Sequence, residues 1–190
     1  MILKSRNLIC AAFAVLCVVI GGASAAVHDN AFGVRGGFGT QFGGEVDYQK
    51  KMGKDTRLQV GISYNYDTEL SGLSRYGFGW HWICAVGFYH WHWDIDNKGL
   101  GFYAGPGADM GVLHWSYEVG GYYGYYGSRD SYTISYTGFS MSVGGEAGIE
   151  YDLNVSKTPL LLSLDIRPMV GLVHSRNFNF CVGLAGRYTF

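Results

Sequence analysis

Apolar and polar residues alternate along most of the chain after residue 30. The clearest case is the last segment, Phe178–Phe190, in which every second residue from Phe178 onward is apolar or aromatic except Gly186. The segment Arg57–Tyr66 alternates in the same way. A period of two residues places successive side chains on opposite faces of a β-strand. The pattern therefore predicts strands with one apolar face and one face of polar or small residues.

Eight segments with this pattern are separated by turn residues. The predicted strands cover residues 31–39, 42–50, 57–66, 77–95, 100–113, 137–152, 160–173 and 178–190. The segment 77–95 does not keep one phase, because Trp80 and Trp82 share parity with the polar face of its second half. A bulge near Cys84–Gly87, or a first half that lies outside the membrane, would explain the change. Pro106 predicts a kink or bulge in the fifth strand, since proline donates no ladder hydrogen bond.

The predicted connections differ in length on the two sides of the sheet. Those at 52–55, 96–99 and 154–159 are short, whereas 67–76 and 114–136 on the other side are long. Outer-membrane barrels have short periplasmic turns and longer outer loops, with aromatic girdles near both ends of the strands. The lengths predict that both termini lie on the periplasmic side, since an even number of strands returns the chain to its starting side.

Composition supports a sheet that closes on itself. All but Gly21 and Gly22 of the 30 glycines, all 15 tyrosines and all 5 tryptophans follow residue 25. No apolar run there approaches the roughly 20 residues that a transmembrane helix needs. In lipid every backbone N–H and C=O must be satisfied internally, which without helices requires a closed sheet. We predict an all-β fold: an eight-stranded antiparallel up-and-down transmembrane β-barrel that forms one domain, residues 26–190.

The amino terminus predicts export. Lys4 and Arg6 precede the apolar run Leu8–Ile20, which is too short for a transmembrane helix. Ala23–Ala25 fits a small-x-small cleavage site. Residues 1–25 are therefore predicted to be a cleaved signal peptide, with an uncleaved anchor as the alternative. The predicted location is the bacterial outer membrane.

Six short motifs carry a family resemblance. They are Gly33–Gly37, Glu45–Gln49, Tyr103–Gly107, Gly148–Tyr151, Leu164–Pro168 and Gly186–Phe190. Their order resembles small Gram-negative outer-membrane proteins with an "outer membrane protein β-barrel" domain, in the broad OmpA/OmpX-like class. The resemblance covers the whole chain after the signal peptide. It implies a fold and a location rather than an activity.

The carboxyl terminus resembles the membrane-assembly signal of such barrels. The chain ends on Phe190, with a second aromatic residue, Tyr188, two positions earlier. Ala185 stands where this signal usually has glycine. The resemblance implies that barrel-assembly machinery recognises the last strand and that outer-membrane lipid surrounds the barrel.

The polar face of the predicted strands assigns a set of charged residues to the barrel interior. An eight-stranded barrel is just wide enough for side chains to fill it. Charges in so narrow a space must pair, so we predict a salt-bridged network that closes the lumen. The predicted network consists of Arg35, Glu45, Asp47, Asp109, Glu146, Glu150, Asp165, Arg167 and Arg187. Because acidic residues outnumber arginines in this set, a narrow gated channel is the alternative.

The sequence does not favour cofactor or nucleic-acid chemistry. Cleavage of the signal peptide removes two of the 14 basic side chains and leaves 15 acidic ones, with no basic stripe for nucleic acid. His90, His92 and Asp94 share one strand face, but metal sites usually draw ligands from several elements. Cys84 and Cys181 fall on the fourth and eighth strands, on opposite sides of the ring, and are predicted to be free thiols. No cofactor is predicted.

Three function classes remain open at this stage. A structural or surface-interaction role is predicted, with an extracellular ligand at the Tyr- and Gly-rich loop 117–136, whose alternative is an extension of the barrel strands. A few eight-stranded barrels modify lipid A, but only His174 and Ser175 are near each other at an outer loop, without a matching acid. A secreted lipocalin-like binder would need an apolar interior and a polar exterior.

Overall fold

The protein forms eight antiparallel strands joined by short turns and longer connections. The computed structural model describes residues 29–67, 79–95, 99–119, 132–175 and 177–190. The strands are β1 Asn30–Gly39, β2 Phe42–Lys51, β3 Thr56–Asp67, β4 Gly79–Asp94, β5 Leu100–Val119, β6 Tyr132–Asp152, β7 Leu160–Val173 and β8 Asn179–Thr189, with a 3-10 helix, η2, at Leu153–Ser156. The predicted signal peptide lies outside the described residues. Within the described part, no helix is long and apolar enough to cross a membrane.

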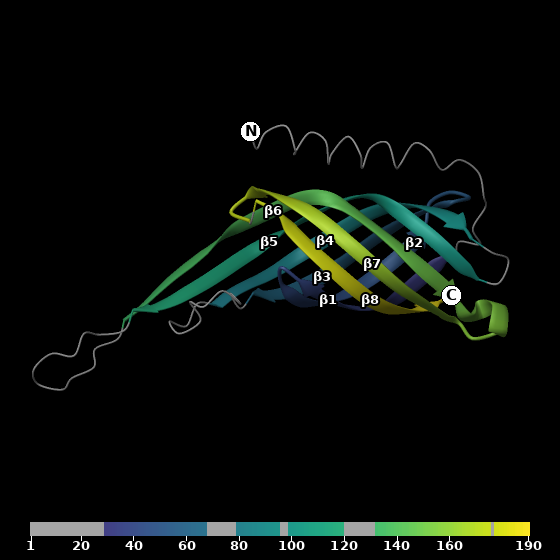
Figure 1. The fold of residues 1–190 in the computed structure, drawn as a ribbon, viewed down its shortest axis with the longest axis horizontal. Helices are drawn as coiled ribbons and strands as arrows, with labels where there is room; N and C mark the ends of the chain where they lie inside the picture. Colours follow the sequence, from purple (N-terminus) through teal and green to yellow (C-terminus); the bar gives the residue numbers. More distant parts are fainter. Residues whose placement is uncertain (1–28, 68–78, 96–98, 120–131, 176) are drawn as a thin grey trace, which may run out of the picture.

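The strands close into a barrel in simple chain order. Each strand pairs with its sequence neighbours, and β1 pairs with β8. The seam extends to the ends of the barrel, where Asn30 and Phe190 exchange backbone hydrogen bonds of 3.1 and 2.9 Å. The first strand therefore begins, and the last strand ends, on the side of the short turns (Figure 1). The predicted eight-stranded antiparallel up-and-down β-barrel is confirmed.

The two faces of the wall carry opposite chemistry. Outward positions are apolar and strongly exposed, for example Ile62 at 66% and Leu184 at 62%. Inward positions are buried and largely polar, such as Gln59 on β3 and Arg187 on β8. This is the reverse of a soluble lipocalin, so the predicted faces are confirmed and the lipocalin alternative is wrong.

Strand β4 differs from its prediction. Its register with β3 runs without a shift from Asp67↔Trp80 to Thr56↔Trp91, and no residue is inserted near Cys84–Gly87. The predicted bulge is therefore wrong. Trp82 and three further residues, Cys84, Val86 and Phe88, face the lumen in phase with the histidines. The alternation in this segment suggests a change of phase because the lumen-facing residues in this part of β4 are apolar.

The irregular positions of the sheet lie elsewhere. At Pro106 the paired positions of β4 and β5 stop at Phe88↔Gly107 and resume at Trp91↔Ala104 with the register unchanged. The ladder is thus interrupted at the proline without an inserted residue, so of the two predicted alternatives, kink or bulge, the bulge is wrong. A true shift occurs between β6 and β7, where Met141 pairs with Val173 and the next residue, Ser142, pairs with Gly171. Leu172 is the additional residue of this bulge.

The barrel is much taller on one side. Strands β1 and β2 have 10 residues each, whereas β5 and β6 have 20 and 21. β5 and β6 stay paired as far as Val119↔Tyr132, and Figure 1 shows this ribbon projecting beyond the barrel body. Much of the predicted loop 114–136 is therefore strand, which favours the extension alternative for these residues. The centre of that segment, residues 120–131, lies outside the described residues.

Candidate functional site: the barrel interior

Arg187 and Asp47 form a two-point charge pair in the interior. Arg187 on β8 donates from Nε to Asp47 Oδ1 at 2.7 Å and from Nη2 to Oδ2 at 3.0 Å. Its Nη1 donates to Ser163 Oγ at 2.8 Å. Both charged side chains are fully buried. Such a two-point contact fixes the geometry of the guanidinium as well as balancing its charge.

Arg167 joins two carboxylates near the centre of the lumen. Its Nε donates to Glu146 Oε2 at 2.6 Å, its Nη2 donates to Glu45 Oε1 at 3.2 Å, and its Nη1 also contacts Glu45. Tyr103 adds a hydroxyl hydrogen bond of 3.0 Å to Glu146 Oε1. The cluster therefore links strands β2, β5, β6 and β7 across the barrel.

A third pair crosses between β1 and β7. Arg35 donates from Nε to both carboxylate oxygens of Asp165 at 3.0 Å, and its Nη2 contacts the same carboxylate. The pair packs against Gly183 on β8, because a methyl group there would collide with the Arg35 guanidinium. A glycine on the inward face thus provides the room that the arginine occupies.

Arg57 also belongs to the interior, although it is not among the residues predicted for the charged network. It donates from Nη2 to Glu150 Oε2 at 2.5 Å and from Nε to His92 Nε2 at 3.1 Å. His92 Nδ1 lies 3.2 Å from the other Glu150 oxygen. Arg57 shares parity with the inward residue Gln59, so the alternation could have found it. Arg57 is the first residue of the predicted strand, beside the turn at 52–55, where the alternation is hard to recognise.

His90 is enclosed without a hydrogen-bond partner on either ring nitrogen. Its ring lies 4.9 Å from the Tyr103 ring centroid, and its Nε2 is 3.9 Å from Glu146 Oε2. Within the described ranges, no group of three or more His, Cys, Asp and Glu residues is arranged to hold a metal ion. His90 and His92 act here as packed parts of the polar network, with His92 directly bound to Arg57 and Glu150.

An apolar cluster fills the other part of the interior. Phe88 packs beneath Arg167, whose Cζ lies 4.4 Å from the ring centroid. Cys84 is buried in this cluster, and both it and Cys181 on β8 are free thiols, which agrees with the prediction. The cluster consists of Trp82, Cys84, Val86, Phe88, Leu113 and Met169. The interior therefore contains a charged network and, beside it, a hydrophobic cluster.

A small cavity remains between the two halves. It measures about 40 Å³ and its walls include Arg35, Asp109, Arg167 and Cys181. A cavity of this size holds on the order of three water molecules. Asp109, predicted for the ion-pair network, contributes to this cavity wall. The other predicted interior residues lie in the three arginine clusters and the Arg57–Glu150 pair.

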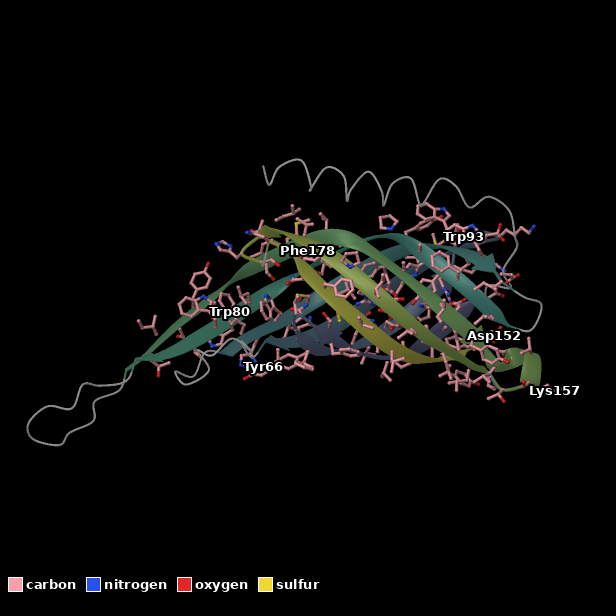
Figure 2. The ribbon with its side chains drawn as sticks, viewed as in Figure 1. Tyr66, Trp80, Trp93, Asp152, Lys157 and Phe178 are labelled. Carbon is pink, nitrogen blue, oxygen red and sulfur yellow. The ribbon has the colours of Figure 1, made fainter. Side chains whose placement is uncertain are left out.

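The ends of the barrel carry aromatic residues. Trp93 and Phe102 face each other near the short turns, with ring centroids 5.5 Å apart, and the terminal rings of Tyr188 and Phe190 stack at 6.2 Å. Figure 2 shows Trp93 toward the end that carries Asp152, with Tyr66 toward the opposite half. Aromatic residues at these two levels are typical of interfacial girdles.

Comparison with known proteins gives a shared fold. No family model and no curated protein sequence matches the chain. A major outer-membrane protein from Thermus thermophilus aligns at 14% identity with a TM-score of 0.52, over 86% of this chain and 100% of that one. Neisserial surface protein A aligns at 14% identity and a TM-score of 0.48, over 89% and 100% of the two chains. Ail of Yersinia pestis also gives 14% and 0.48, over 85% and 96%. The Thermus structure shows that an outer-membrane protein has the fold of this chain.

Proposed function

We propose that the protein is an integral outer-membrane β-barrel whose lumen is closed by its own side chains and whose outer end serves surface interaction. The single observation that carries this proposal is the inversion of the wall, apolar outside and charged inside. A soluble protein rarely exposes a continuous apolar belt. A barrel in lipid requires one.

The packing of the interior supports a closed lumen. Arg35, Arg167 and Arg187 each bind a carboxylate from a different strand, so the charged residues bridge the barrel in several directions. The apolar cluster around Phe88 occupies another part of the interior. The cavity between them measures about 40 Å³, which is on the order of three water molecules and supports a closed lumen.

We also propose that the protein is not an enzyme. A hydrolase would need the Ser175 hydroxyl beside a base. Instead, Ser175 Oγ lies 3.0 Å from Ser142 Oγ, and the His174 ring packs against Tyr136 with centroids 5.9 Å apart. This arrangement supports a structural role for both residues.

Two measurements test the membrane and closed-lumen parts separately. Unboiled protein from outer-membrane fractions should migrate faster than boiled protein in an SDS gel, because a closed barrel resists SDS. Migration that does not change, with the protein in the soluble periplasmic fraction, would reject the membrane assignment. Purified barrels in planar bilayers should give no steady opening. A reproducible nanosiemens-scale conductance would instead favour the gated channel, for which the cavity beside Arg35 and Arg167 is the starting point.

A further inference from the structure

The projecting ribbon reverses the facial pattern of the barrel wall. Below the projection, the outward residues Ile83, Val112 and Phe139 are apolar and more than half exposed. The change from apolar to polar outward residues occurs at one row of paired residues. In this row His81 pairs with His114, and His114 pairs with Thr137. These three outward side chains are polar.

Hydrogen bonds hold this polar row on the outward-facing side of the ribbon, which is its convex side. His81 Nδ1 lies 2.7 Å from the Tyr64 hydroxyl, and His114 Nδ1 lies 2.8 Å from Thr137 Oγ1. Ser116 and Ser135 continue the polar face as the next outward positions on β5 and β6. The ribbon above this row therefore does not face hydrocarbon, so its concave face cannot be explained by contact with lipid.

The concave face of the ribbon carries a row of aromatic rings. Trp80, Trp115 and Tyr136 are direct cross-strand partners on β4, β5 and β6. Their ring centroids are 6.0 and 6.1 Å apart, and neighbouring rings are inclined by 35° and 30°. Trp82 stacks below Trp80 at 5.9 Å. Trp80 and Trp115 are partly buried and pack against the apolar cluster of the interior. Ordinary girdle residues face outward, so these inward rings do not belong to a girdle.

Tyr136 shows how the row is presented. Its ring lies over Gly138, where an added methyl group would approach the Tyr136 hydroxyl to 2.6 Å and ring carbons to 2.7 and 2.8 Å. One face of the ring is thus pressed onto the strand, and the side chain remains 39% exposed. The opposite wall does not cover the row at this height, because β1 and β2 are half the length of β5 and β6.

We propose that Trp80, Trp115 and Tyr136 form a stacking platform for a neutral oligosaccharide that enters from outside the cell. A pyranose ring has an apolar C–H face that fits an aromatic face and a rim of hydroxyl groups. The inward positions 80, 82, 111, 113, 115, 134, 136, 138 and 140 hold no charged residue. The β3 partner of Trp80 is the acidic residue Asp67, so the row offers no cation to an acidic glycan.

Neutral hydrogen-bonding groups lie one to three inward rows below the platform. Asn65 pairs with Trp82 across β3 and β4, and Ser142 and Ser175 share a hydrogen bond near the bulge. Ser140 Oγ and Asn179 Oδ1 are buried without a hydrogen-bond partner. Hydroxyl groups of a sugar can both donate to and accept from such amides and hydroxyls.

The orientation of the platform selects the source of the glycan. Sugars attached to lipids of the surrounding membrane meet the convex face, with His81 and His114. The aromatic row faces the barrel axis, on the side of the wall away from lipid. A soluble oligosaccharide therefore fits this site, and membrane-linked lipopolysaccharide does not.

The test uses the folded full-length barrel in a detergent without a sugar headgroup. Maltohexaose, cellohexaose and chitohexaose are titrated while tryptophan fluorescence is recorded, and a heparin hexasaccharide serves as the charged probe. At least one neutral probe should give a saturable change. Trp115→Leu, which keeps apolar bulk but removes the ring, should weaken binding about tenfold or more, whereas Trp115→Phe should retain most of it.

A matched control changes the convex face of the same strand. His114→Ala should bind the neutral probe as the unaltered protein does. The proposal is wrong if no neutral probe binds at millimolar concentration, if only heparin or membrane-linked lipopolysaccharide binds, or if Trp115→Leu binds normally. Each variant is first checked for faster migration when unboiled. The stacking platform rests on the proposed surface role. If the barrel passes the gel and conductance tests but binds no sugar, only the platform is wrong and the proposed barrel function stands.

Discussion

Removal of the Arg187 guanidinium should be among the most destabilising single changes in the barrel. The Arg187→Met substitution preserves an unbranched side chain but deletes four donated hydrogen bonds, two to Asp47 and one each to Ser163 and Gln59. Asp47 would lose its arginine partner while buried at about 1% exposure. Breaking a buried pair from one side costs about 3–5 kcal/mol. That loss lowers the folding equilibrium constant by a factor of roughly 10² to 10⁴.

The companion variants separate the charge from the packing. Asp47→Asn alone leaves the arginine unpaired and should cost a similar amount. The double variant Asp47→Asn/Arg187→Met removes both charges, and replacement of a whole buried pair is often close to neutral. The double variant should therefore be more stable than Arg187→Met, with a coupling energy of about 2 kcal/mol or more.

The assay is urea unfolding of the barrel in phospholipid vesicles, followed by tryptophan fluorescence. Refolding and unfolding curves must coincide before free energies are compared. Lys51→Met is the control, because the Lys51 ammonium lies 3.7 Å from Asp29 in an exposed pair. Exposed pairs contribute about 0–1 kcal/mol.

Two outcomes would refute the reasoning. One is an Arg187→Met variant that unfolds within about 1 kcal/mol of the unaltered protein, as the Lys51 control should. The other is a double variant that is no more stable than the single ones. Either result would mean that water reaches Asp47 and that the lumen is less closed than the packing indicates.

Three further predictions concern single positions. Gly183→Ala should lower the unfolding free energy by about 1–3 kcal/mol, since the new methyl group displaces Arg35, while Gly36→Ala, with no atom within 4 Å, should be neutral in the same urea assay. Lys157 has a φ of 63°, so Lys157→Gly should raise stability by up to about 1 kcal/mol, and a loss of stability would contradict the strain at this turn. Phe190→Ala should reduce the protein in outer-membrane fractions on an immunoblot while refolding in vitro is retained; unchanged amounts in the membrane would remove the terminal residue from the assembly signal.

The side chains of the outer wall were predictable because lipid permits one chemistry there. Every outward position must be apolar or small, so the alternation in segments such as Arg57–Tyr66 gave both the strand and its faces. The number of strands and their order followed from turn residues and from the requirement that no edge remain open. These features depend on local periodicity and on the solvent, and both can be judged from the sequence.

The interior was only partly predictable because several chemistries can fill a lumen. A packed interior accepts a tryptophan as readily as a paired arginine, so the inward residues Trp82 and Cys84 looked like a break in phase. The partners within the charged set were also undetermined, since parity says that Arg35 and Asp165 share the interior but not that they touch. They stand 130 residues apart in the chain.

Sequence alone thus determined the strands, their lipid-facing side and most of the charged content of the lumen, with Arg57 as the exception. Tertiary structure decided which arginine meets which carboxylate, where the apolar cluster lies, and that residues 114–119 and 132–136 of the predicted outer loop form a two-faced ribbon. The physical reason is that alternation specifies a face within one strand. Barrel closure and the register between strands decide which of those faces meet, and at what height above the membrane each side chain lies.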